Sequence, residues 1–208
     1  MDRPVSPTGR AGATTGQPGR AAATRKALLA AARDVFAAAG FAEASIADVV
    51  ARAGASVGSL YHHFGGKADL YLALYEDFAD AQEARAADAV SLARAAGRGR
   101  PLEQFLAGAR AYLEGCWLER DLARLFLAGG GPPGFELVVR RRHRDWVRAN
   151  ATLLQAEDSP YDEALVLVLT TVVGEAGAEV AISETADKAA ALADAVLELV
   201  SRIGTPTG

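Results

Sequence analysis

The chain has 208 residues, of which half are apolar and only 7% are aromatic. This length suits one domain, or a small domain joined to a larger one, with a sizeable core. Alanine supplies much of the apolar content, which favours packed helices and argues strongly against an all-β fold. No stretch approaches the roughly 20 uninterrupted apolar residues of a membrane span, and the N-terminus lacks the apolar segment of a signal peptide. A cytoplasmic protein with no membrane partner is therefore expected.

The formal net charge of −4 is unevenly distributed along the chain. Residues 1–66 hold seven Lys or Arg against four acids, whereas residues 67–208 hold 15 against 22. The basic N-terminal part indicates a polyanionic partner, although chance also produces an imbalance of this size. The single cysteine, Cys116, excludes an intrachain disulfide, and with three histidines it leaves little for a zinc site. We expect neither a metal nor another cofactor.

Residues 1–22 are rich in Pro and Gly, with Val5 as their only large aliphatic residue. Such a segment buries too little apolar surface to offset its ordering entropy, so a disordered arm is predicted. Its three arginines could follow a DNA backbone, and a plain solvated tail is the simpler alternative. Helical periodicity begins after Thr24, a plausible N-cap, and predicts a first helix over residues 25–39 that Gly40 and Phe41 end.

Two short helices follow. Ser45 predicts the N-cap of a helix over residues 46–53, which Gly54 ends. Ser56 predicts the N-cap of the next, which would carry Val57, Leu60 and Phe64 on its inner side. Two short helices joined by so tight a turn make a helix-turn-helix.

The rest of the chain continues the helical pattern without any sustained alternation of period two. The predicted helices cover residues 67–96, 101–116, 119–128, 134–155, 160–182 and 184–203. The sequence therefore predicts an all-α fold of nine helices without a sheet.

The segment ASIADVVARAGASVGSLYHHFGGKADLYLALYE, residues 44–76, resembles the DNA-binding segment of TetR-family transcriptional repressors. The preceding segment, TRKALLAAARDVFAAAGF, resembles the first helix of that family. The sequence differs from the commonest pattern of the family at Val50, Val57 and Gly65-Gly66. The resemblance implies a helix-turn-helix domain over residues 23–66, after the arm, and an effector-binding and dimerisation domain over residues 67–208. It further implies a homodimeric regulator, a repressor that a small-molecule effector releases from a pseudo-palindromic double-stranded DNA operator.

Several residues of the third helix suit contact with DNA. Gly58, between Val57 and Ser59, gives a low profile for close approach, an apolar contact for a thymine methyl and a hydroxyl for base edges. Tyr61 and His62 face outward and can reach phosphates or a base edge, whereas the neighbouring His63 is expected to flank the core. Neighbours on a helix point about 100° apart, so these two histidines cannot share a metal.

Phosphate contacts are expected at three helix starts. Lys67 places a cation in a first turn, where it opposes the helix dipole, and a bound phosphate would explain it. An ordinary solvated lysine is the alternative. Ser45 and Ser56 could hold phosphates likewise, and Arg25 completes the expected DNA-binding set.

Small residues follow one stripe of the helix over residues 160–182. Gly174, Gly177 and Ala178 fall at i, i+3 and i+4, a pattern that asks for another helix packed closely against it. In TetR-family repressors the last two helices form the dimer interface. The resemblance therefore implies that these residues form it here, together with Val196 and Val200. Close packing inside one subunit is the alternative.

Aromatic residues gather between these two regions. The resemblance implies an effector pocket there, with Tyr112, Trp117, Phe126 and Trp146 as its expected walls. Ordinary core packing explains most such residues. The arginine-rich run over residues 140–148 could recognise an acidic ligand, and a solvated face paired with acids is the simpler explanation.

Two other functional classes compete with a DNA-binding regulator: an enzyme and a small-molecule-binding protein. The sequence lacks the residue patterns of an enzyme site, because Cys116 has no neighbouring His and no predicted helix carries a metal-binding His spacing. No catalytic residue is therefore expected. A helical small-molecule-binding protein that has lost DNA binding is harder to dismiss, because Val57 weakens the basic character of the third helix.

Overall fold

The computed structural model describes residues 17–127 and 130–204, and within these ranges lie nine helices and no strand. The helices are α1 (Gln17–Glu43), α2 (Ile46–Ala53), α3 (Val57–Phe64), α4 (Lys67–Ala95), α5 (Pro101–Leu118), α6 (Arg120–Leu127), α7 (Phe135–Leu154), α8 (Pro160–Ile182) and α9 (Ala186–Ile203). The all-α fold expected from the sequence is confirmed.

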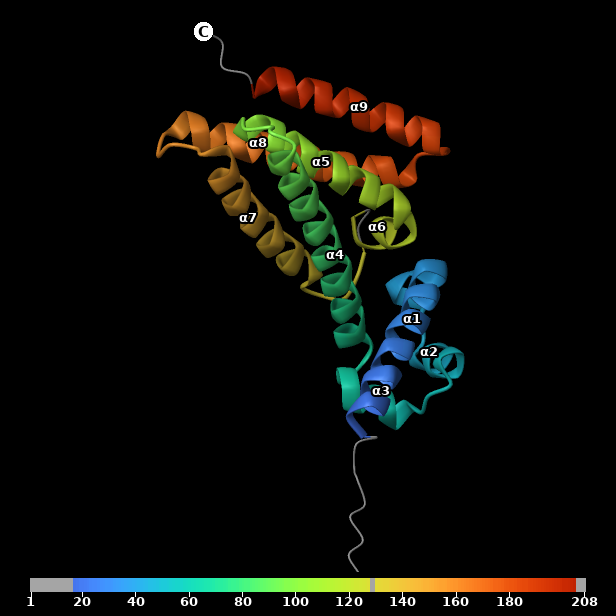
Figure 1. Ribbon diagram of the computed structural model, residues 1–208. Helices are drawn as coiled ribbons and strands as arrows, with labels where there is room; N and C mark the ends of the chain where they lie inside the picture. Colours follow the sequence, from blue (N-terminus) through green and yellow to red (C-terminus); the bar gives the residue numbers. More distant parts are fainter. Residues whose placement is uncertain (1–16, 128–129, 205–208) are drawn as a thin grey trace, which may run out of the picture.

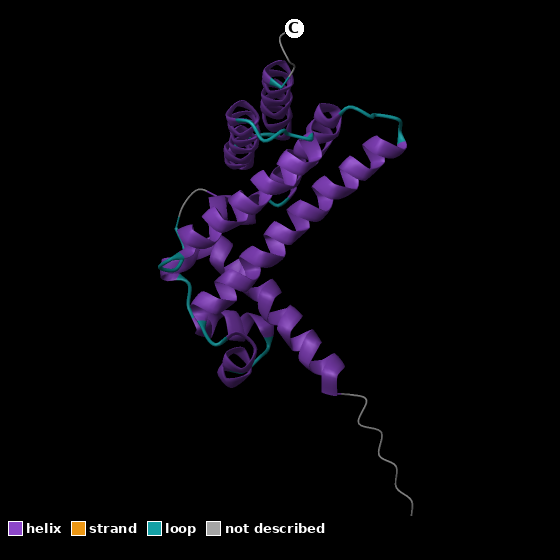
Figure 2. Cartoon of the chain, turned by 90° about the vertical axis from the view of Figure 1, so that its left-hand side faces the viewer, coloured by secondary structure: helices purple, strands orange, loops and turns teal. Residues whose placement is uncertain are grey.

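The long helix α4 connects two groups of helices (Figure 1). The short helices α2 and α3 pack with α1 around the first turns of α4, whereas α5, α8 and α9 lie across its far end. Helix α6 contacts both α1 and α8, and α7 packs on α5 and α8. A view turned by 90° shows how the loops join these helices (Figure 2).

Helix α1 begins earlier than predicted. It starts at Gln17, and the Thr24 hydroxyl, expected to cap it, donates instead to the carbonyl oxygen of Arg20 inside the helix (2.9 Å). The alanines at positions 21–23 explain the extension, because alanine has the highest helix propensity. Residues 17–22 of the expected arm are therefore helical, and residues 1–16 lie outside the described part of the chain. Gly40, with φ 72°, breaks the helix where its end was predicted.

The boundaries of the two short helices agree with the prediction. Ser45 and Ser56 adopt extended backbone, and each accepts a hydrogen bond from the backbone N–H three residues on (3.1 Å in both cases). Gly54 and Gly65 end the two helices in the left-handed conformation, with φ 61° and 66°. Each cap bonds only to residues close to it in the chain, so its position could be predicted from the local sequence.

Helix α8 is the one described helix that is long and apolar enough to cross a membrane. It packs against α5, α6, α7 and α9, and it buries Val166, Leu169, Val173 and Val180. Its apolar character therefore fits a helix at the centre of the C-terminal group.

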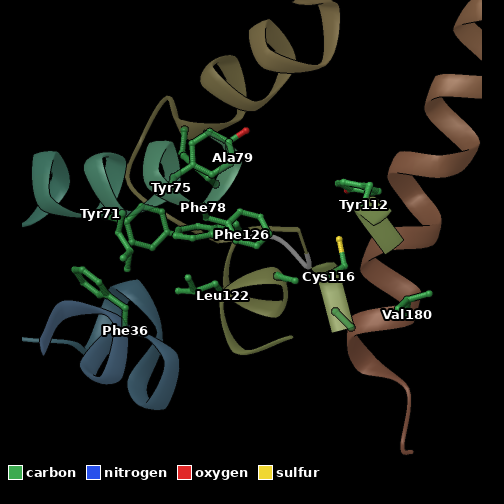
Figure 3. Packing of buried hydrophobic residues seen from close by; sticks show 14 of the residues in the cluster. Phe36, Tyr71, Tyr75, Phe78, Ala79, Tyr112, Cys116, Leu122, Phe126 and Val180 are labelled. Atoms are coloured by element: carbon green, nitrogen blue, oxygen red, sulfur yellow. The ribbon is translucent and has the colours of Figure 1, made fainter. Parts of the chain in front are cut away.

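One hydrophobic core runs through both groups of helices (Figure 3). Phe36 of α1 packs edge-on against Tyr71 of α4, with ring centroids 5.3 Å apart, and Tyr71 packs likewise against Phe126 of α6 at 5.1 Å. Edge-to-face pairs stabilise by about 0.5–1.5 kcal/mol beyond their buried area. The N-terminal helices are thus held to α4 and α6 through packed aromatic rings.

Candidate DNA-binding and ligand-binding sites

The exposed side of α3 carries the residues expected to meet DNA. Leu60 and Phe64 are buried, which turns Gly58, Tyr61 and His62 toward solvent. Val57 is 48% exposed, so its predicted place on the inner side is wrong, and it lies with the solvent-facing residues. Val57 is the first residue of α3.

Gly58 lies on an open surface. A Cβ added there would meet nothing closer than the Ser56 hydroxyl oxygen at 4.0 Å. The fold itself therefore does not require a glycine at this position. A partner that approaches the backbone closely would require one, which agrees with the role expected from the sequence.

The two histidines of α3 divide as expected. His62 is exposed and His63 is half-buried, with their ring centroids 5.2 Å apart. His63 also lies beside the Phe64 ring, at the edge of the core. Only His62 is therefore available to a partner along the exposed side of α3.

Lys67 has a structural role that the sequence did not reveal. Its Nζ donates to the carbonyl oxygen of Ala42 (2.9 Å) and lies 4.7 Å from the centroid of the Phe41 ring. These contacts tie the start of α4 to the end of α1 and offset the unfavourable helix dipole. A lysine ammonium has three donors, so a phosphate contact stays compatible with this geometry.

The other expected phosphate ligands lie at the surface of the same domain. The Ser45 hydroxyl donates to Asp48 (2.6 Å), whose carboxylate already lies in the first turn of α2. Ser56 caps α3 and stays exposed. The Arg25 guanidinium lies 5.2 Å from the centroid of the Phe64 ring, beside the end of α3. Of these three residues, Ser45 has the surroundings least suited to an anion.

A cavity of about 850 Å³ lies between α4, α5, α6, α7 and α8, and we call it the front chamber. Three of the four expected wall residues, Tyr112, Phe126 and Trp146, line it. Trp117 does not, and its assignment is corrected: its ring stacks with the Arg120 guanidinium, 4.6 Å away, at the end of α5. The remaining aromatic walls are Tyr75, Phe78 and Phe135, which were not among the expected wall residues.

Charged side chains from α7 and α8 also line the front chamber. Arg142 forms ion pairs with Asp80 and Glu83 of α4, the latter at 3.3 Å, as expected for a helix face paired with acids. Arg140, Glu136 and Glu175 line the same chamber and are exposed. His143 faces Thr171 of α8, with 3.3 Å between Nε2 and Oγ1. The chamber thus combines an aromatic interior with a charged edge.

Within the subunit, the small-residue stripe of α8 faces Tyr112 of α5 and the front chamber. A Cβ on Gly177 would lie 2.7 Å from the Tyr112 ring of α5, so the glycine is needed for packing within the chain. Gly174 and Ala178 line the front chamber. Val200 is fully buried, and Val196 is half-buried. Close packing inside one subunit, the alternative left open by the sequence, explains Gly177 but not Gly174, where an added Cβ would meet nothing within 4 Å.

Cys116 is unsuited to nucleophilic chemistry. It is buried, and burial raises the pKa of its thiol to about 12, so the thiol stays protonated at neutral pH. Among residues 17–127 and 130–204, no three His, Cys, Asp or Glu side chains gather as a metal site would need.

These features define a helix-turn-helix protein that pairs an exposed recognition helix with a separate internal cavity. The sequence model of a family described as bacterial regulatory proteins, tetR family, matches residues 28–74, which run from α1 into α4. Residues 28–74 therefore form a helix-turn-helix DNA-binding domain of the tetR type, and the chain has the fold of TetR-family transcriptional regulators.

Solved structures extend the likeness over most of the chain. A TetR-family transcriptional regulator from Pectobacterium atrosepticum is 29% identical, with a TM-score of 0.63 over 88% of this chain and 94% of that one. A putative TetR-family regulator from Syntrophomonas wolfei is 15% identical, with a TM-score of 0.71 over 89% and 96% of the two chains. The latter likeness concerns the fold alone. A search of curated proteins found no match.

Proposed function

We propose that this regulator is a homodimeric repressor that binds a pseudo-palindromic operator and is released by a small molecule in the front chamber. The observation that carries the proposal is the path of α4. Its first residue is tied to the end of α1, and about two and three turns later Tyr75 and Phe78 form part of the chamber wall. A ligand that shifts this wall therefore acts on a helix attached to the DNA-binding domain.

The geometry of operators explains why a small shift is sufficient. Two recognition helices of a dimer must reach half-sites one helical turn of DNA apart, about 34–36 Å, or a multiple of it. A tilt of α4 in each subunit changes the separation of the two α3 helices. The ligand's differential affinity for the two conformations sets the loss of DNA affinity, typically about 5- to 150-fold.

The dimer is supported by the outward side of the last two helices. Large apolar residues are exposed there, with exposed fractions between 37% and 55%: Leu167, Val168, Val172, Leu199 and Ile203. Exposed apolar residues on two helices that contact each other favour an interface. We therefore assign the dimer to this outward side, in place of the stripe that contains Gly177, and we place the protein in the cytoplasm with its DNA.

Selection of bound sequences from a random DNA pool tests DNA recognition. The selected operator is then titrated with the wild type and with Gly58→Glu, which places an anion against the bases on an open surface. We expect about a hundredfold loss of operator affinity with an unchanged helical circular-dichroism signal. Gly99→Glu is the matched control, because it adds the same charge in open space near α5. Equal loss in both variants, or none in Gly58→Glu, contradicts the assigned contact.

The second candidate is a protein of the same fold that binds small molecules and has lost DNA binding. It is favoured by the exposed side of α3, where Val57, Gly58 and Tyr61 carry no charge. A salt titration separates the two, because binding through phosphates weakens steeply as salt rises. Failure to enrich any sequence from the pool at low salt would favour this candidate.

A further inference from the structure

A second cavity of about 330 Å³ lies between α4, α5, α7 and α8, and we call it the rear chamber. Tyr112, Trp146 and Gly174 line both chambers. The two aromatic rings meet edge to face, with centroids 5.1 Å apart and an angle of 86° between their planes. The chambers are therefore neighbours that share these three residues.

Gly174 leaves space at this boundary. A Cβ added to it would meet no atom within 4 Å, whereas one added to Gly177, one turn on, would collide with Tyr112. Packing therefore explains Gly177 but leaves the glycine at 174 unexplained, although glycine weakens a helix. An open passage between the chambers explains it, because any side chain there would project into the space that both chambers share.

The walls of the rear chamber suit an aliphatic group. Apart from Tyr112 and Trp146, which it shares with the front chamber, its apolar lining is small and aliphatic with one further aromatic ring, and includes Ala86, Val90, Phe105, Ala149, Leu153 and Val173. Its polar residues are bound to other protein groups. Asn150 donates to Thr170 (3.1 Å), and Arg94 donates to Gln104 (2.7 Å). Chain-like apolar groups can fill such a space without breaking these hydrogen bonds.

Three further polar side chains of the rear chamber also have partners within the protein. Glu83 pairs with Arg142, and Ser91 donates to the carbonyl oxygen of Ala87. Gln82 donates to Glu119, and its buried amide oxygen has no hydrogen-bond partner among the described residues. Trp146 Nε1, at the boundary with the front chamber, is the other buried side-chain polar atom without a partner in the described part of the chain.

The front chamber differs, because three of its charged residues form no ion pair among the described residues. Two of them, Glu136 and Glu175, are acidic, and one, Arg140, is basic. Arg142, the other cation of this wall, is already held by two acids. The remaining balance favours a cationic group, and the aromatic interior is also suited to bind one.

We propose that the two chambers form one site for a cationic amphiphile with a single aliphatic chain. Its ammonium head lies in the front chamber near Glu136 and Glu175. Its chain passes Gly174 into the rear chamber. This inference rests on the proposed role of the front chamber as the effector site and adds the chemical class of the effector.

Calorimetric titration of the full chain, without DNA, tests the proposal at concentrations below micelle formation. The probes are octyltrimethylammonium, dodecyltrimethylammonium and dodecanoate. We expect the dodecyl cation to bind at least about tenfold more tightly than the octyl cation, because each buried methylene strengthens binding. Dodecanoate should bind about fivefold or more weakly than the dodecyl cation. Equal affinity for the two cations would show that the rear chamber does not hold the aliphatic chain. Equal affinity for dodecanoate and the dodecyl cation would show that the site does not select a cationic head.

Gly174→Leu closes the proposed passage. It should weaken dodecyl binding by about tenfold and leave octyl binding within about twofold, which removes the difference between the chains. Ala149→Leu fills the rear chamber from the exposed side of α7 and should act likewise, so the test survives if the first variant folds poorly. Ala164→Leu, exposed on α8, is the control and should change neither value. Unchanged discrimination between chain lengths in both chamber variants overturns the proposal.

The same titrations separate this inference from the proposed function. If the dodecyl cation binds as expected and the selected operator stays bound in its presence, the site stands and its role in release fails. If the cations do not bind while the operator does, the chemical class is wrong and DNA recognition is unaffected.

Discussion

Arg33 of α1 holds Asp121 of α6 through two hydrogen bonds, from Nε to Oδ2 at 2.8 Å and from Nη2 to Oδ1 at 2.7 Å. The same guanidinium reaches Glu119 at 3.3 Å, and Glu119 also accepts from Arg85 of α4 at 2.7 Å. One ionic network therefore joins α1, α4 and α6. Because α6 also carries Phe126 into the front chamber, a ligand that moves α6 pulls on α1 through Arg33.

The first prediction concerns this network. Arg33→Met should leave operator affinity nearly unchanged but lower the release by ligand about fivefold or more, because α6 loses its bond to α1. Stability should fall by only about 1 kcal/mol, because both partners are partly exposed. Arg52→Met removes an ion pair with Asp34 that does not involve α6, and it serves as the control. Anisotropy titrations of DNA with and without ligand measure both effects, and undiminished release in Arg33→Met would contradict the role of the network.

The second prediction follows from the pKa of Asp121. Burial alone would raise the pKa of this carboxyl, but the hydrogen bond and charge of Arg33 outweigh burial and hold it below its ordinary value. The folded state therefore binds this proton less readily than the unfolded state. The resulting stability is present above the unfolded value of about 4 and is lost as pH falls through the lower folded value.

Thermal unfolding between pH 6 and pH 2.5 checks this sign. The Tm of the wild type should exceed that of Asp121→Asn at pH 6, and the difference should shrink toward zero at the acid end. Asp88→Asn alters an exposed aspartate without an ion pair among the described residues, and it should give no such trend. A difference that stays constant with pH would mean that Arg33 does not stabilise the charged carboxylate.

The third prediction compares two glycines of α8. Gly177→Ala should destabilise the protein by about 1–3 kcal/mol, because the added Cβ would lie 2.7 Å from the Tyr112 ring. Gly174→Ala should stabilise it by up to about 1 kcal/mol, because the added Cβ meets open space and alanine favours the helix. Urea unfolding measures both, with light scattering to follow the oligomer. A shift of Gly177→Ala toward monomer at unchanged subunit stability would restore the original interface assignment.

Local signals and tertiary contacts explain which parts of the fold the sequence could predict. The ends of α2 and α3 are set by residues that bond to their own near neighbours in the chain, which are Ser45, Gly54, Ser56 and Gly65. Such local signals can be recognised in the sequence. The start of α1 could not be predicted in this way, because its alanines favour a helix without forming an apolar pattern.

The sites were harder to predict than the helices. The exposed side of α3 followed once Leu60 and Phe64 were assigned to the core. The stripe at Gly177 signalled a close neighbour correctly, but only the structure identifies that neighbour as Tyr112 of the same chain. The network around Arg33 joins residues more than 80 positions apart, and no local pattern indicates it.

The last prediction separates the two tryptophans that the sequence had grouped together. Trp146 lines both chambers, and its Nε1 is buried without a hydrogen-bond partner, so Trp146→Ala removes wall surface and leaves no partner unpaired. Trp117 lines neither chamber and stacks with Arg120. For a ligand found by thermal-shift screening of small apolar compounds, Trp146→Ala should weaken binding by about tenfold or more, because an aromatic wall is lost. Trp117→Ala should lower Tm through lost packing but leave ligand affinity within about twofold. Calorimetry on both variants decides the matter: a ligand that needs Trp117 and ignores Trp146 binds outside the two chambers.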